Sequence, residues 1–348
     1  MVTRARKKGA PLPKAQGCEN MVSAVCLVLS LVGQPASPVI LVEGAGGTAE
    51  YSKQFSEWGD TWQQAGESGG HTVMRLLPSD NQKQQLLEKI EALPPSPQQT
   101  SWLILIGHGT FDGRTSRFNM QGPDLTPDEL KAVLDKRPAE EEWVIIQASA
   151  ASGPFLASLS GPKRIVLTAT RSGDELSVSR LGGVLAKSLQ DPEADLDQDD
   201  QVSLLEAFIS SGLRVTEFYE SEGRLVTEHA LLDDNGDQKG TPQDWFQGLR
   251  LTKKAVDGVA ADGVRARQIH LIPSPWEALR SPEWRNQRDR LERQLQDLKD
   301  RQTELAPDDY RRQLREIIEQ LATLYRETRA EDAAEDEASD DEAAGEEK

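Results

Sequence analysis

The segment WLILIGHG, residues 102–109, places five consecutive large apolar residues before a histidine that lies between two glycines. A continuous apolar run of this length, bounded by glycine, predicts a strand buried on both faces. Further predicted strands lie at residues 38–43 (PVILVE), 72–77 (TVMRLL), 143–147 (WVIIQ) and 164–169 (RIVLTA). Helical patterns separate these strands. The sequence therefore predicts an α/β fold with a mostly parallel sheet and helices on both faces.

Polar residues directly follow two of the predicted strands. His108 follows the strand at 102–106, and Ser149 and Ser152 follow the strand at 143–147. A histidine between glycines often only marks a turn. In an open parallel sheet, however, sites form at the carboxyl ends of the strands. These residues are therefore the candidate site of the domain, which we expect to span residues 38–273.

The order of these segments resembles that in the legumain-type cysteine endopeptidases (asparaginyl endopeptidases), which are relatives of the caspases. WLILIGHG and WVIIQASAASG resemble the His-Gly and Cys-x-Ser-Gly segments that follow two successive strands in that family. VEGAGGTAEYSKQF and RIVLTATRSGDELS resemble its first strand and a later strand with its loop. The resemblance covers roughly residues 39–179. It implies a caspase-like fold.

The resemblance also implies roles for single residues. His108 takes the place of the catalytic histidine, and Ala150 takes the place of the nucleophilic cysteine. Ser52 stands where the family has an arginine that binds the substrate side chain, and Glu50 stands where an asparagine orients the histidine. Glu175 corresponds loosely to a second pocket residue.

The substitution at position 150 is decisive for the chemistry. The family's mechanism needs a thiolate beside an imidazole, and the methyl group of Ala150 cannot attack a carbonyl carbon. The only cysteines of the sequence, Cys18 and Cys26, lie far from this position. We therefore expect a non-proteolytic relative, a pseudopeptidase, that acts as a binding or scaffolding module for a protein or peptide partner.

A serine hydrolase is the alternative, in which Ser149 or Ser152 acts as nucleophile with His108. Both serines flank the position that the resemblance assigns to the nucleophile, and a misplacement of about 1 Å already costs about a hundredfold in rate. We expect Ser152 instead to cap the helix predicted at residues 154–159.

Acidic residues form a second candidate site. Residues 195–206 have the spacing of a twelve-residue calcium loop, in which alternate residues and a final glutamate supply oxygen ligands. The candidate ligands are Asp195, Asp197, Asp199, Gln201 and Glu206. Asp200 stands where such loops have glycine, and aspartate tolerates the left-handed conformation better than most residues. The alternative is an acidic surface loop that caps the next helix.

Calcium binding by this loop would support a third function, that of a calcium-stabilised structural protein of the cell envelope. A shorter acidic run at residues 233–237 contains Asp233, Asn235 and Asp237 but no final glutamate. We expect an ordinary Asp/Asn/Gly turn there, with a weaker oxygen-ligand site as the alternative.

The C-terminal part has a different pattern. Apolar residues at helical spacing predict two helices over residues 282–328, separated by a break at Ala-Pro-Asp-Asp, residues 306–309. Two helices joined by a short turn form an antiparallel hairpin. The hairpin either packs only on itself or mediates self-association.

The net charge of -18 is concentrated at the end of the chain, where residues 331–348 contain ten acidic residues and one lysine. We expect a disordered acidic tail over residues 329–348. No basic stripe interrupts the acidic composition, and acidic surfaces repel phosphate backbones, so we expect no nucleic-acid partner.

The N-terminus resembles a signal peptide. Basic residues precede an apolar run of thirteen residues at 21–33 (MVSAVCLVLSLVG), which is short for a membrane span and suits the core of a signal peptide. A buried first strand or helix is the alternative. We expect residues 1–37 to be a leader and the mature protein to be secreted or periplasmic, with no transmembrane segment after the leader is removed.

Overall fold

A computed structural model describes residues 36–253 and 262–346, with side chains as far as Arg329. The expected leader therefore lies almost entirely outside the described residues. None of the helices in the described ranges combines the length and the apolar character that crossing a membrane requires.

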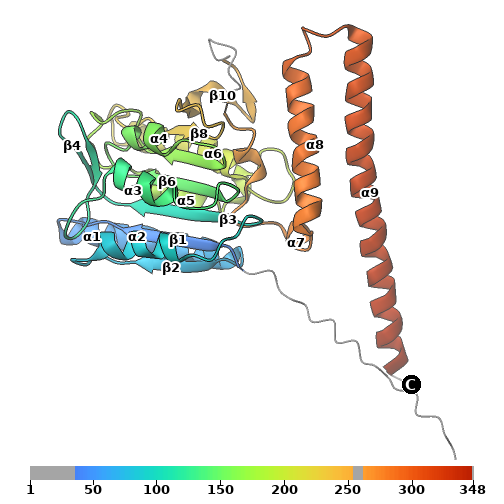
Figure 1. The fold of residues 1–348 in the computed structure, drawn as a ribbon, viewed down its shortest axis with the longest axis horizontal. Coiled ribbons are helices and arrows are strands. Elements are labelled where there is room, and N and C mark those ends of the chain that lie inside the picture. Colours follow the sequence, from blue (N-terminus) through green and yellow to red (C-terminus); the bar gives the residue numbers. More distant parts are fainter. Residues whose placement is uncertain (1–35, 254–261, 347–348) are drawn as a thin grey trace, which may run out of the picture. The chain divides into compact units, whose positions relative to one another are not determined.

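The domain is built on a seven-stranded, mostly parallel sheet (Figure 1). Its order is β2-β1-β3-β6-β7-β8-β9, and only the last two strands run antiparallel to their neighbours. The bounds are β1 Pro38–Glu43, β2 Thr72–Leu76, β3 Thr100–Ile106, β6 Glu142–Ala148, β7 Arg164–Thr168, β8 Leu231–Asp233 and β9 Thr241–Pro242. All five predicted strands are present, so the prediction of a mostly parallel α/β sheet is confirmed.

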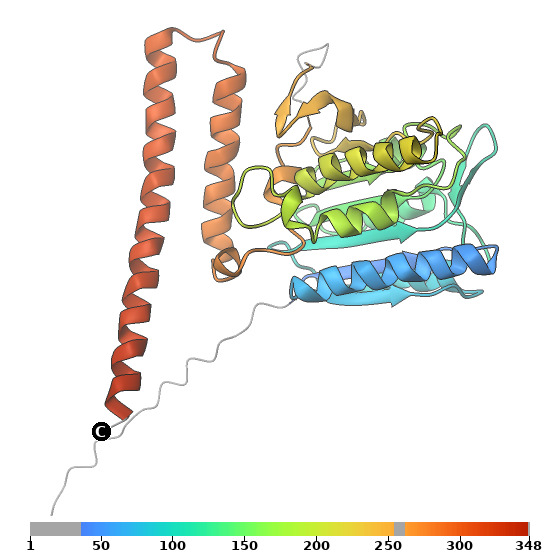
Figure 2. The same ribbon diagram turned by 180° about the vertical axis from the view of Figure 1, so that it is seen from behind.

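Helices cover both faces of this sheet, as Figures 1 and 2 show from opposite sides. One face packs on α1 (Ala49–Ser68), α5 (Leu181–Ser188) and α6 (Leu204–Ser221). The other packs on α2 (Gln82–Ala92), α3 (Pro127–Leu134) and α4 (Gly153–Leu159). Alternate residues of β3 enter opposite cores: Ile104 packs toward α1, and Leu103 packs toward α2. This two-sided burial explains why the strand sequences are continuously apolar.

Local sequence signals set several helix ends. Thr126 forms a capping box with Glu129 at the start of α3, with Pro127 in the first turn. The helix α2 ends at Ala92, just before Leu93 and Pro94. Two short antiparallel pairs were not predicted: β4 (Gly109–Phe111) with β5 (Ser116–Phe118), and β10 (Phe246–Gln247) with β11 (Arg250–Leu251).

The C-terminal helices α8 (Pro282–Asp300) and α9 (Pro307–Glu346) pack side by side as an antiparallel pair after the short helix α7 (Pro275–Ala278) (Figure 1). The predicted hairpin is therefore present, and α9 begins at the predicted break. The backbone of α9 continues as helix to Glu346, where the sequence predicts a disordered tail from 329. Alanine and glutamate, which dominate this segment, have high intrinsic helix propensity.

Candidate functional site

The strand order places a topological switch point at the carboxyl ends of β1 and β3. Among the described residues the sheet begins with β1, next to the edge; β2 is added on its outer side, and β3, β6 and β7 then follow on the other side. The direction of winding thus reverses between β1 and β3, which is where open α/β sheets bind ligands. The glycine-rich segments after these two strands, residues 44–47 and 107–109, lie at this position.

His108 connects the two segments. Its Nε2 lies 3.1 Å from the carbonyl oxygen of Gly46, and its ring packs edge-on against Tyr51 (4.7 Å between centroids) and Phe55 (5.0 Å). With Nε2 protonated, the imidazole donates this hydrogen bond to the backbone. The contact and the two aromatic rings fix the orientation of His108 and occupy one of its nitrogen atoms.

The loop after β6 packs directly against the His108 loop. A Cβ placed on Gly109 would lie 1.9 Å from the carbonyl oxygen of Ala150 and 2.8 Å from Ser149 Oγ. Only a glycine fits there, so the fold brings His108–Gly109 and Ser149–Ala150 together, as the sequence predicts. Ser149 is 1% exposed, and its hydroxyl donates to the Ala150 carbonyl oxygen (3.0 Å). Among the described atoms, no hydrogen bond joins the Ser149 hydroxyl to the His108 imidazole.

Ser152 does not have the predicted capping role. It precedes α4, but its side chain makes no capping hydrogen bond. Its Oγ instead lies 3.1 Å from Thr170 Oγ1 and accepts from the Thr170 backbone N–H (3.0 Å). The contact with Thr170, which follows β7, thus replaces the local helix cap. The hydroxyl of Ser152 is fully buried and hydrogen-bonded, so it is not available as a nucleophile.

Glu50 and Ser52 lie in the first turn of α1. Glu50 is exposed. Ser52 donates through Oγ to the Thr48 carbonyl (2.8 Å), and it lies against Gly46, where a Cβ would be 2.3 Å from Ser52 Oγ. Ser52 therefore supports the segment that holds His108, and it lacks the positive charge that the family places there.

A second histidine, which no sequence pattern indicates, lies beside this edge of the sheet. His229 Nδ1 contacts the Glu175 carboxylate (2.8 Å), which also pairs with Arg171 Nε (3.0 Å). The Glu175 carbonyl oxygen accepts from the Ala151 N–H (2.8 Å), and Ala151 has a left-handed φ of 54°. Glu175, which aligned only loosely with a pocket position, thus holds the loop that contains Ala150.

Gln147 is the other residue that sequence reasoning missed. It is fully buried near the end of β6, and neither of its amide atoms has a hydrogen-bond partner among the described residues. A buried amide without partners costs a few kcal/mol. The available signal was a single polar residue at the end of an otherwise apolar strand.

The acidic loop forms the second candidate site. Carboxylate oxygens of Asp195, Asp197 and Asp199 all lie within 4.8 Å of one another, and this group could hold a metal ion. Partial burial, then the charges of Asp197 and Glu206, raise the pKa of Asp199 to about 6 against the hydrogen bonds from Gln201. Asp200 has a φ of 68°, so it adopts the left-handed conformation expected at the glycine position.

Two of the predicted ligands have other roles. Glu206 forms a capping box with Ser203 at the start of α6, and its second oxygen accepts from the Leu196 N–H (2.8 Å). Gln201 donates through Nε2 to Asp199 (3.1 Å) and accepts through Oε1 from the Ser274 N–H (3.0 Å). Of the five predicted ligands, Asp195, Asp197 and Asp199 are grouped, whereas Glu206 is engaged at the helix terminus and Gln201 at Ser274.

The run at residues 233–237 is a turn, as expected. Gly236 has a φ of 79°, Asp233 accepts from its N–H (2.9 Å), and Asn235 accepts from the Asp237 N–H (2.8 Å). Asp233 is fully buried. Its carboxylate is engaged by the turn itself.

No protein-family model matches the chain, and no curated protein matches its sequence. Solved structures that are similar to it at low identity include the three that follow. Protein GSU0716 from Geobacter sulfurreducens is 15% identical, with 51% of this chain and 89% of that one covered and a TM-score of 0.36. Caspase-1 from Spodoptera frugiperda is 9% identical, with 57% and 86% covered and a TM-score of 0.37. The Drosophila initiator caspase Dronc is 12% identical, with 67% and 93% covered and a TM-score of 0.38.

Proposed function

We propose that the chain is a non-proteolytic, caspase-like protein that binds a protein or peptide partner at the carboxyl ends of β1, β3 and β6. The observation that carries this proposal is the state of the polar groups at that edge. His108 Nε2 is engaged by the Gly46 carbonyl, and the Ser149 hydroxyl donates to the Ala150 carbonyl. A nucleophile and a base that are each bonded to the backbone do not form the pair that acyl transfer needs.

The missing thiol supports the same proposal. Ala150 occupies the position that the family resemblance assigns to the nucleophile, and Cys18 and Cys26 are the only cysteines in the sequence. The loop is nevertheless held in place, since the Ala151 N–H donates to the Glu175 carbonyl oxygen and Gly109 lies directly against the Ala150 carbonyl oxygen. A strand-end surface that lacks a nucleophile can retain a peptide without cleaving it.

The test compares turnover with binding. The full chain and its His108→Ala and Ser149→Ala variants are incubated with fluorescent peptides that contain Asn or Asp. We expect no hydrolysis above the buffer rate in any sample. Fluorescence anisotropy with the same uncleaved peptides should show saturable binding that His108→Ala weakens.

An opposite result would be clear. Turnover by the wild type that disappears in His108→Ala or Ser149→Ala would establish the serine hydrolase alternative. Absence of both turnover and binding for every peptide would remove the proposal of a peptide partner at this edge.

A calcium-stabilised envelope protein is the second candidate function, and the three grouped aspartates favour it. Three carboxylates within contact distance repel one another, and Ca²⁺ prefers six or more oxygen ligands, which backbone carbonyls and water can complete. Calorimetric titration with CaCl₂ and, separately, MgCl₂ tests this proposal. We expect calcium to bind more tightly, since Mg²⁺ demands a stricter octahedral geometry.

For both candidate functions we propose that the chain is exported to the periplasm or secreted, because its N-terminal basic and apolar segments resemble a signal peptide. N-terminal sequencing of the exported protein should find a start near Ser37 or Pro38. Folded protein that retains Met1 in a cytoplasmic fraction would contradict export.

Self-association through α8 and α9 is a further proposal, and sedimentation of the full chain over a range of concentrations tests it.

A further inference from the structure

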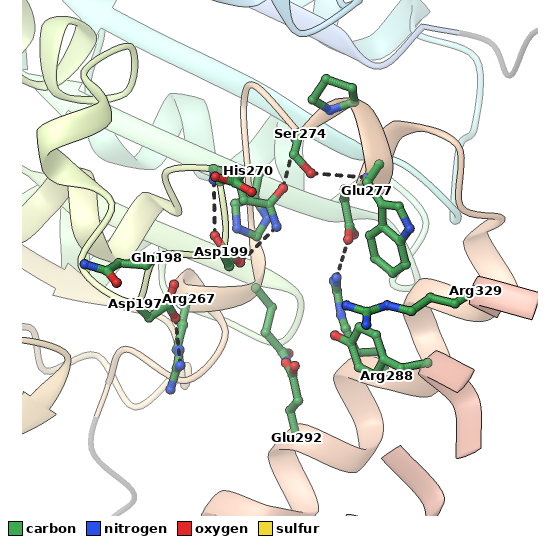
Figure 3. Close-up of a pocket in the computed structure, with 16 residues that line it drawn as sticks. Asp197, Gln198, Asp199, Arg267, His270, Ser274, Glu277, Arg288, Glu292 and Arg329 are labelled. Atoms are coloured by element: carbon green, nitrogen blue, oxygen red, sulfur yellow. Dashed lines mark hydrogen bonds and ion pairs between the residues drawn. The ribbon is translucent and has the colours of Figure 1, made fainter. Parts of the chain in front are cut away.

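A cavity of about 620 Å³ lies between the acidic loop and the base of the α8–α9 pair (Figure 3). Residues 197–201, Arg267 and His270 line one side. Trp276 and Glu277 of α7, Arg288 and Glu292 of α8, and Tyr325 and Arg329 of α9 line the other. Its volume is in the range of small-ligand sites. It is remote in sequence from the strand-end site proposed above and shares none of that site's residues.

One end of the cavity is acidic. Asp197 is neutralised by Arg267 (2.8 Å), but Asp199 and Asp200 have no cationic partner among the described side chains. His270 does not offset their charge, because burial and then the Arg288 charge lower the pKa of its imidazole to about 3. A neutral imidazole leaves this end negative and available to a cation.

The opposite end presents a cation, Arg329. Arg288 is compensated by Glu277 and Asp289. Arg329, by contrast, has no ion-pair partner within the part of the chain whose side chains are described. In Figure 3 the Arg329 side chain extends from α9 toward Arg288, on the side of the cavity away from Asp199.

An aromatic wall lies at the cationic end. The rings of Trp276 and Tyr325 are stacked, with 5.8 Å between centroids and 9° between planes, and Trp284 packs edge-on against both. This cluster fixes the two rings that line the cavity. It offers flat apolar surface to a ligand between the two charged ends.

We propose that this cavity binds a short zwitterionic peptide, with the ammonium group at Asp199 and Asp200, the carboxylate at Arg329, and an apolar side chain on Trp276 and Tyr325. Separated charges of opposite sign around an apolar wall complement such a ligand and disfavour ligands with only one of its charges. The ligand source is either a free peptide or a protein segment that carries both charges on its side chains.

Isothermal titration calorimetry in EDTA tests the inference, with the dipeptide Ala-Phe as probe. We expect saturable binding, and we expect N-acetyl-Ala-Phe and Ala-Phe-amide each to bind at least about tenfold more weakly, since each loses one charge-assisted contact. Arg329→Gln and Asp199→Asn should each weaken Ala-Phe by a similar factor. The matched controls are Arg326→Gln and Glu193→Gln, which remove exposed charges that do not line the cavity, and they should leave the affinity unchanged.

A blocked tripeptide, acetyl-Lys-Phe-Glu-amide, separates the two sources. Tighter binding than that of Ala-Phe assigns the site to a protein segment, and weaker binding assigns it to free peptides. The inference is overturned if neither probe binds at millimolar concentration, or if Arg329→Gln and Asp199→Asn bind as well as the controls. Either failure leaves the proposed strand-end function untouched, because that site shares no residue with this cavity.

Discussion

The strand-end edge and the acidic loop differ in the charge that their hydrogen-bonded polar groups carry. At the strand ends, His108, Ser149 and Ser152 are each hydrogen-bonded to a backbone or side-chain group of the fold. In the loop, the carboxylates of Asp195, Asp197 and Asp199 lie close together. Among the described side chains, Arg267 pairs with Asp197, and the negative charge of the group exceeds the positive charge beside it. The strand-end side chains are therefore not free to act as nucleophile and base, whereas the loop carries negative charge that a cation would neutralise.

The largest effect is expected from a substitution that disrupts the close packing of the two loops at the strand-end edge. Gly109→Ala would force a methyl group against the Ala150 carbonyl oxygen and so separate the two loops. We expect this change to lower the free energy of unfolding by more than about 3 kcal/mol, in the range of severe steric substitutions. Urea denaturation measures it.

The control for this prediction is Gly161→Ala, where the nearest atom to the new methyl group would be the side-chain Cδ of Arg164 at 3.9 Å. That variant should remain within about 0.5 kcal/mol of the wild type. Equal stability of the two variants would show that the His108 and Ala150 loops are not packed as tightly as the structure places them.

A smaller effect is expected in the second region. At ten times its dissociation constant, calcium should raise the free energy of unfolding by about 1.4 kcal/mol through mass action. Thermal unfolding in EDTA and in CaCl₂ measures the shift. Asp199→Asn should reduce it strongly, and Glu193→Gln should not.

Glu206→Ala is a poor probe for the same question. Glu206 caps α6 and holds the Leu196 N–H, so its loss should lower the midpoint even in EDTA. A calcium shift that Asp199→Asn retains in full would identify the loop as an acidic cap without a metal.

The smallest effect concerns pH. The pKa of Asp199 is raised to about 6 in the folded chain from its ordinary value of 3.8, so the folded state holds this proton more tightly than the unfolded state. Its contribution to stability is complete below about pH 4 and is lost as the pH rises through 6. Because the carboxyl group is only partly buried, solvent screens its interactions, and we expect only about 1 kcal/mol.

Denaturation in EDTA at pH 4.5 and 7, on the wild type and on Asp199→Asn, isolates this contribution. The variant should lose less stability than the wild type over that interval. An identical pH dependence of the two proteins would mean that solvent and counterions already relieve the repulsion in the loop.

The apolar runs of the sequence and the breaks between them determined most of the architecture. Continuous apolar runs predicted the central strands because both faces of a parallel sheet are buried, and the break at residues 306–309 predicted the start of α9 at Pro307. The same logic placed His108 and Ala150 at one edge, since parallel strands share their carboxyl ends. Asp200 could be expected in the left-handed region from its place in the loop pattern alone.

Only the tertiary structure decided which partner each polar group takes. Ser152 looked like a local cap, but Thr170, which follows another strand, engages its hydroxyl. Glu206 looked like a ligand, but it completes a helix terminus. Arg329 and Asp199, 130 residues apart in sequence, line one cavity. Sequence patterns report on neighbours along the chain and on burial, whereas hydrogen bonds and ion pairs depend on distances that only packing sets.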